Sequence, residues 1–149
     1  MIKLFEFFKF YKKGLNITYS AVVLDKESSD LLLSTLIYPN SEFSDWKIIC
    51  DHMTICMGEL PEHLKRYWLG EEVTLTAREI GISDKAVAVK VIGFFNISKP
   101  DAEDDLARFP HITLAINPTD AKPIDSNYIE NWQKIKPLKL RGVVKEIQI

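Results

Sequence analysis

This sequence contains few cysteines and few glycines, and neither positive nor negative charge is in large excess. Each of these features excludes a class of protein. The 149 residues include only two cysteines and six glycines, and 19 basic residues nearly balance 21 acidic ones. This composition excludes a disulfide-dense miniprotein and a collagen-like repeat. The net charge of −2 argues against binding long nucleic acid through phosphate contacts alone and favours a small or terminal substrate.

Long apolar runs are missing as well, because no stretch of 18 uncharged apolar residues occurs, and a transmembrane helix is therefore excluded. Hydrophobic residues still make up 46% of the chain, enough for the core of a single domain spanning residues 1–149. Cys50 and Cys56 would lie about 20 Å apart in one strand, so we expect reduced cysteines in a cytoplasmic protein.

The apolar and basic residues 1–15 are interrupted by Lys3, Glu6 and Lys9 and lack a small-residue cleavage site, which disfavours a signal peptide. We expect an N-terminal extension that packs as a strand or helix on the domain. A surface amphipathic membrane anchor is the alternative.

The hydrophobic pattern of the remaining chain predicts an α+β fold. Strands are expected at Tyr19–Leu24, Trp46–Met57, Glu72–Ile82, Lys85–Phe95, Pro110–Ile116 and Leu138–Ile147, and helices at Lys26–Ile37, Glu62–Leu69 and from Ser126 to about Lys134. Successive strands can pair through hairpins, so the sheets should be mostly antiparallel with helices on the outside.

Two of the three histidines lie in matching contexts. His52 and His111 each begin a His-x-Thr-apolar motif within an expected strand, with Thr54 and Thr113 as the hydroxyl residues. Side chains alternate between the two faces of a strand, so each histidine and its threonine should share a face. The same alternation predicts that Asp51 points away from His52.

This pair of motifs resembles the signature of the 2H phosphoesterase superfamily. The segments YSAVVLD, SDKAVAVKV and PHITLAINP are similar to its tRNA-ligase-like, RNA-repair cyclic phosphodiesterase branch, from about Tyr19 to the C-terminus. The resemblance implies two sheet-bearing lobes around a cleft, with one motif on each lobe. It also implies that His52 and His111 are the catalytic pair and that Thr54 and Thr113 bind phosphate oxygens.

These residue types suit the opening of a ribose 2′,3′-cyclic phosphate at an RNA 3′ end or on a nucleotide. One imidazole would take a proton from water and the other would give one to the leaving oxygen, because an imidazole pKa near 6.5 permits both roles. The threonine hydroxyls would stabilise charge on the phosphate oxygens. This chemistry requires no metal or other cofactor, and the sequence does not indicate which histidine is the acid.

Other interpretations remain open. The same four residues could cleave 2′–5′ linked oligonucleotides, or the chain could be a catalytically idle RNA- or nucleotide-binding module. Three further residues are candidate substrate contacts: Lys90, Tyr19 and Arg141.

A zinc site built from Cys50, Cys56, His52 and His63 is disfavoured. Cys50 and Cys56 could not both reach one ion from a single strand, and zinc ligands usually come from turns with closer cysteine spacing. His63 has no threonine partner and is expected to be a surface residue.

Overall fold

The computed structural model describes residues 17–93 and 109–148, so the expected N-terminal extension lies outside the described residues. The strands are β1 (Ile17–Leu24), β2 (Lys47–Ile48), β3 (His52–Met57), β4 (Glu72–Ile82), β5 (Ala86–Gly93), β6 (His111–Ile116) and β7 (Trp132–Gln148). The helical segments are α1 (Lys26–Leu32), η2 (Leu33–Ile37), η3 (Ser41–Phe43), α2 (Glu62–Trp68) and η4 (Pro123–Tyr128). Within the described part of the chain, no helix is long and apolar enough to cross a membrane.

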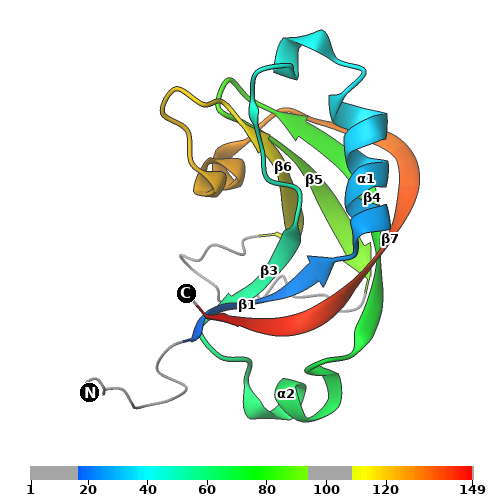
Figure 1. Ribbon diagram of the computed structural model, residues 1–149, viewed down its shortest axis with the longest axis vertical. Helices are drawn as coiled ribbons and strands as arrows, with labels where there is room; N and C mark the ends of the chain where they lie inside the picture. Colours follow the sequence, from blue (N-terminus) through cyan, green and yellow to red (C-terminus); the bar gives the residue numbers. More distant parts are fainter. Residues whose placement is uncertain (1–16, 94–108, 149) are drawn as a thin grey trace.

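The strands form one antiparallel sheet in the order β2-β6-β3-β1-β7-β4-β5. Strand β5 also pairs with β6, so the sheet closes on itself (Figure 1). The expected α+β class with mostly antiparallel strands is confirmed. The two expected lobes are joined, because the strands that bear the two histidine motifs are neighbours in this single sheet.

The core is built by alternation along the strands and by one helix. Val73, Leu75 and Ala77 of β4 are buried while Thr74 and Thr76 face outward, as a half-covered strand requires. Helix α1 packs against β7 (Figure 1). The helix begins at Asp25, whose carboxylate accepts a hydrogen bond from the Ser28 backbone N–H at 2.8 Å.

The expected strand Trp46–Met57 is broken in two. Cys50 has a φ of +38°, and this left-handed backbone separates β2 from β3. Its side chain is nevertheless fully buried, and burial raises the pKa of the Cys50 thiol to about 11. Cys50 and Cys56 do not form a disulfide with each other.

The expected helix from Ser126 to Lys134 is wrong. The short 3-10 segment η4 ends at Tyr128, and the 17-residue strand β7 begins at Trp132. Tertiary pairing with β4 takes precedence over local helix propensity here. Pro137 fits in β7 because residues 135–137 lie opposite Arg78 in a register shift. At such an irregularity the proline does not need a backbone N–H to pair with β4.

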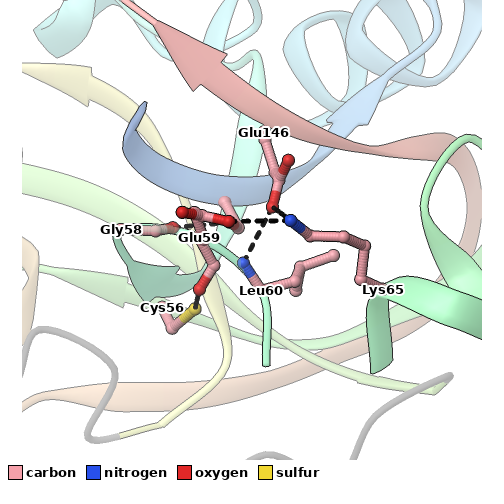
Figure 2. A network of polar contacts seen from close by, with 7 residues as sticks. Cys56, Gly58, Glu59, Leu60, Lys65 and Glu146 are labelled. Atoms are coloured by element: carbon pink, nitrogen blue, oxygen red, sulfur yellow. Dashed lines mark hydrogen bonds and ion pairs between the residues drawn. The ribbon is translucent and has the colours of Figure 1, made fainter. Parts of the chain in front are cut away.

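The C-terminal end of β3 is fixed by a polar network with β7 (Figure 2). The Glu146 carboxylate accepts a hydrogen bond from the Leu60 backbone N–H at 3.0 Å and lies 3.3 Å from the Lys65 ammonium. Lys65 also contacts Glu59 at 2.7 Å. The side chain of Glu146 is only 12% exposed, so this network anchors the chain that follows β3 to β7 in a partly desolvated position.

Candidate active site

The two histidine motifs lie side by side where β3 meets β6. The only residue pair between these strands is Met53 with Ile112, and both side chains are buried in the core. Because side chains alternate along each strand, His52 and Thr54 lie on the opposite face from Met53, and His111 and Thr113 lie on the opposite face from Ile112. The two histidines and two threonines therefore share the face opposite the core.

Beyond that single pair the two strands diverge. Met53 also pairs with Val22 of β1, and β3 follows β1 from there onward, while β6 pairs with β5. A cavity of about 130 Å³ opens at this face. The residues that line it are Thr54, His111, Pro123, Ile124 and Asn127.

His111 is held in a defined tautomer. Its Nδ1 lies 2.9 Å from the Phe109 carbonyl oxygen, and since a carbonyl can only accept, Nδ1 carries the proton and Nε2 is free to accept one. Burial lowers the pKa of His111, the Phe109 hydrogen bond partly offsets this effect, and the charge of His52 lowers the pKa further. The imidazole is therefore neutral at neutral pH, and it is close enough to His52 to feel its charge.

His52 has a different set of neighbours. Its Nδ1 lies 2.6 Å from the Asp51 carboxylate, and its ring centroid lies 5.1 Å from that of Tyr19. The expectation that Asp51 points away from His52 is wrong, because Asp51 precedes the regular part of β3 and the alternation of side chains does not hold there. Burial raises the pKa of Tyr19, with a smaller contribution from Asp51, so the phenol stays neutral.

The two threonines are also unequal. Thr113 is buried; its hydroxyl lies 2.8 Å from the Ser126 hydroxyl and donates a long hydrogen bond of 3.5 Å to the Pro123 carbonyl. Thr54 is half-buried and lines the cavity, and its hydroxyl has no hydrogen-bond partner within residues 17–93 and 109–148. Thr54 is thus the hydroxyl that is ready for a ligand.

Lys90 lies next to His111 across the β5–β6 ladder. Residues paired in this way point to the same face of a sheet. The Lys90 ammonium lies 4.5 Å from the Trp132 ring centroid and 5.0 Å from that of Phe109. The Phe109 ring contacts that of His111 at 5.1 Å, so Lys90 is connected to the site through aromatic side chains.

Arg141 is not brought to the histidines. It lines a different cavity, of about 440 Å³, together with Glu27, Ser28 and Lys139, and its guanidinium lies 3.8 Å from the Glu27 carboxylate. We therefore leave Arg141 out of the proposed site. His63 is exposed on α2, as expected.

Three polar residues at the site were missed in the sequence: Asn127, Ser126 and Asp51. Asn127 and Ser126 lie in η4, where the pattern predicted a helix, and local sequence carries no signal that this segment covers β6. Asp51 could have been found, because an acidic residue directly before a candidate catalytic histidine is itself a signal for an ion pair.

Of the comparisons with known proteins, the one with solved structures gives matches. No family model matches this sequence, and no curated protein sequence matches it. Among the 41 solved chains that match this protein is the crystal structure of a fungal RNA kinase, with 15% identity and a TM-score of 0.53. The match covers 91% of this chain and 43% of the kinase chain. Identity this low establishes a shared fold and nothing about activity.

Proposed function

We propose that this protein opens 2′,3′-cyclic phosphates at RNA ends or on nucleotides by paired-histidine acid–base catalysis without a metal ion. The observation that supports this best is the shared face. Thr54 and His111 line one cavity, and His52 lies close enough for its charge to lower the pKa of His111. Two imidazoles and a free hydroxyl are the groups that this hydrolysis needs.

In the proposed reaction, His111 is the general base and His52 the general acid. Neutral His111 takes a proton from water through Nε2, and the resulting hydroxide forms a bond to phosphorus. The bond from phosphorus to one ribose oxygen breaks, and His52 gives its proton to that oxygen. Asp51 holds the His52 ring through Nδ1, so that Nε2 faces the phosphate.

The hydroxyl of Thr54 would donate a hydrogen bond to a non-bridging oxygen as charge develops on it. Such a donor contributes to the rate only if it is fixed before the reaction begins. The backbone of Thr54 meets this condition because β3 is paired with β1, with Thr54 opposite Ala21. Thr113 would act mainly by fixing Ser126 and the η4 segment above the cavity.

An RNA substrate agrees with the fold comparison, since the neighbour with the same fold is described as an RNA kinase. The chain spans less than half of that protein, so the kinase activity itself is not transferred to this chain.

The test is hydrolysis of nucleoside 2′,3′-cyclic phosphates in EDTA from pH 5 to 9. We expect turnover by the wild type and a loss of about 10²–10⁴-fold in kcat for His52→Ala and for His111→Ala. His63→Ala, which changes an exposed histidine on α2, is the matched control and should keep full activity.

Three outcomes would overturn the proposal. Activity that EDTA abolishes would contradict a metal-free reaction. Faster turnover of 2′–5′ linked oligonucleotides than of cyclic phosphates would favour the alternative phosphodiesterase. Nucleotide binding that survives both histidine substitutions, with no turnover of either substrate by the wild type, would favour an idle binding module.

A further inference from the structure

Basic residues are concentrated in the part of the chain that forms β7. Of the 19 basic residues in the chain, five lie between Trp132 and Lys145, and this stretch contains no acidic residue. The rest of the chain therefore has 14 basic residues against 21 acidic ones. The whole stretch belongs to the single strand β7. A nearly neutral protein thus has one locally positive strand, and clustered basic residues are typical of a surface that binds phosphates.

Two of these basic residues line a cavity of about 440 Å³. The residues that line it are Glu27, Ser28, Leu31, Thr74, Lys139 and Arg141. Lys139 and Arg141 are two residues apart in one strand, so their side chains point to the same face at a spacing of about 6.8 Å. This spacing is comparable to that of neighbouring phosphates in an extended nucleic-acid strand. Thr74 pairs with Arg141 across the β4–β7 ladder and adds a hydroxyl donor to the same face.

The backbone of Arg141 is fixed by the start of α1, and neither cation is strongly neutralised. The Arg141 backbone N–H donates to the Ser28 hydroxyl at 2.7 Å, and its carbonyl accepts from the Asp25 backbone N–H at 3.0 Å. The Glu27 carboxylate lies 3.8 Å from the Arg141 guanidinium, and these side chains are 85% and 57% exposed, so the contact is weak. Lys139 forms no ion pair within residues 17–93 and 109–148. Both cations can therefore bind a phosphate.

The cavity lies on the same face of the sheet as the proposed catalytic site. His52 pairs with Val23 of β1, and Val23 pairs with Val143 of β7, so these three side chains share one face. Arg141 is two residues from Val143 and points to that face as well. Two strand spacings of about 4.8 Å and two residues of about 3.4 Å place the Cα atoms of Arg141 and His52 about 12 Å apart along the sheet. A short single strand of nucleic acid spans this distance.

We propose that the cavity between α1 and β7 binds the phosphodiester backbone of a single-stranded RNA, with Lys139 and Arg141 as its phosphate contacts. The inference rests on the proposed function, because the 3′ end of the same strand would occupy the histidine site. It also names the substrate class, since a free nucleotide reaches only the histidine site, whereas an RNA strand reaches both sites.

The test is calorimetric titration with 3′-phosphorylated oligouridylates of one, two, four and six nucleotides, which bind without being hydrolysed. At 50 mM salt, we expect the six-nucleotide strand to bind about tenfold more tightly than uridine 3′-monophosphate. The gain should shrink as the salt concentration rises, because each phosphate contact releases counterions. Equal affinities for all four lengths at 50 mM salt would overturn the proposal.

A charge-removal variant shows whether the cavity supplies the gain. The double variant Lys139→Gln, Arg141→Gln should lose the tenfold gain and should bind uridine 3′-monophosphate as the wild type does. Its slope of log Kd against log salt for the six-nucleotide strand should fall by about 1.4, at about 0.7 for each lost contact. The control Lys47→Gln, Arg66→Gln removes two exposed charges on β2 and α2 and should keep the gain. An equal loss in the control would show a non-specific charge effect and overturn the proposal.

A variant with the opposite expected effect excludes damage to the fold as the explanation. Glu27→Gln removes a carboxylate that competes with phosphate for Arg141, so it should strengthen binding of the six-nucleotide strand about twofold to threefold. It should leave binding of uridine 3′-monophosphate unchanged. Weaker or unchanged binding of the six-nucleotide strand would contradict a phosphate contact at Arg141.

The results for this cavity and for the catalytic proposal can be told apart. Length-dependent binding that requires Lys139 and Arg141, without any turnover, would support the RNA site and reject the phosphodiesterase. Turnover with the same kcat/KM for a nucleoside 2′,3′-cyclic phosphate and for a six-nucleotide RNA with that end, unchanged in the double variant, would overturn the RNA site alone.

Discussion

The two His-x-Thr motifs are almost identical in sequence, but the structure surrounds them differently. His111 is hydrogen-bonded to the Phe109 backbone carbonyl, and burial lowers its pKa. His52 contacts the Asp51 carboxylate, whose side chain is 65% exposed. Burial disfavours the charged form of His111, and the Phe109 hydrogen bond only partly offsets this effect. The comparison teaches that two copies of one motif can differ in burial and in hydrogen-bond partner, and our proposal of different roles for the two histidines rests on this difference.

The largest expected effect is that of removing His52 on the rate and on the pH dependence of kcat/KM, which distinguishes the roles of the two histidines. In the wild type, the acid limb should lie below pH 6.5, because the pKa of the base His111 is lowered. In His52→Ala, activity should fall about 10²–10⁴-fold, and the acid limb of the residual activity should move to higher pH, because the charge of His52 no longer lowers the pKa of His111. An acid limb that stays in place would mean that His111 is not the base.

The second comparison is between the two threonines. Thr54→Val should lower kcat by about 10–10²-fold through loss of a phosphate donor, and should change the free energy of unfolding by less than about 0.5 kcal/mol. Thr113→Val should lower the free energy of unfolding by about 1–3 kcal/mol, because it leaves the fully buried Ser126 hydroxyl without its partner. Urea denaturation and steady-state kinetics on both variants measure this. The reverse pattern would assign the phosphate contact to Thr113.

A smaller effect is expected at Asp51. Asp51→Asn should reduce kcat about tenfold, since the amide positions the His52 ring less well and gives less stabilisation to the imidazolium. Stability should barely change because the carboxylate is largely exposed. Asp45→Asn, at another exposed aspartate before β2, is the control. Wild-type kinetics for Asp51→Asn would show that the contact has no role in catalysis.

The smallest expected effect is on stability. The pKa of His111 is lower in the folded than in the unfolded chain, so below about pH 6.5 the unfolded chain binds a proton first. The contribution of neutral His111 to stability is therefore complete above that pH, and it is lost as pH falls through the folded pKa. Urea denaturation of the wild type and His111→Asn at pH 7.5 and pH 5 checks this: the variant should lose less stability between the two pH values. Equal losses would contradict the burial of His111.

Much of this architecture could be predicted from sequence periodicity. The alternation in Glu72–Ile82 and the shared face of His111 and Thr113 depend only on local strand geometry, and the structure agrees with both. The joint between β3 and β6 could not be predicted, because a single residue pair, Met53 with Ile112, forms it between segments far apart in the chain. Local patterns carry no information about such a contact.

Other site residues could not be identified from the sequence for the same reason. Asn127 has no motif around it, and its position at the cavity depends on where η4 folds over β6. Arg141 lies on a predicted strand, as expected, but the closed sheet carries it to another cavity. Strand assignment gives the face of a side chain, whereas only the order of strands gives its neighbours.

The central claim is that both imidazoles face one phosphate-binding groove, and NMR of the histidine ring nitrogens tests it most directly. During titration with a nucleoside 3′-monophosphate, Nε2 of His52 and of His111 should shift together with one apparent Kd, while His63 on α2 should not move. Shifts at only one of the two histidines, or equal shifts at His63, would contradict a shared site.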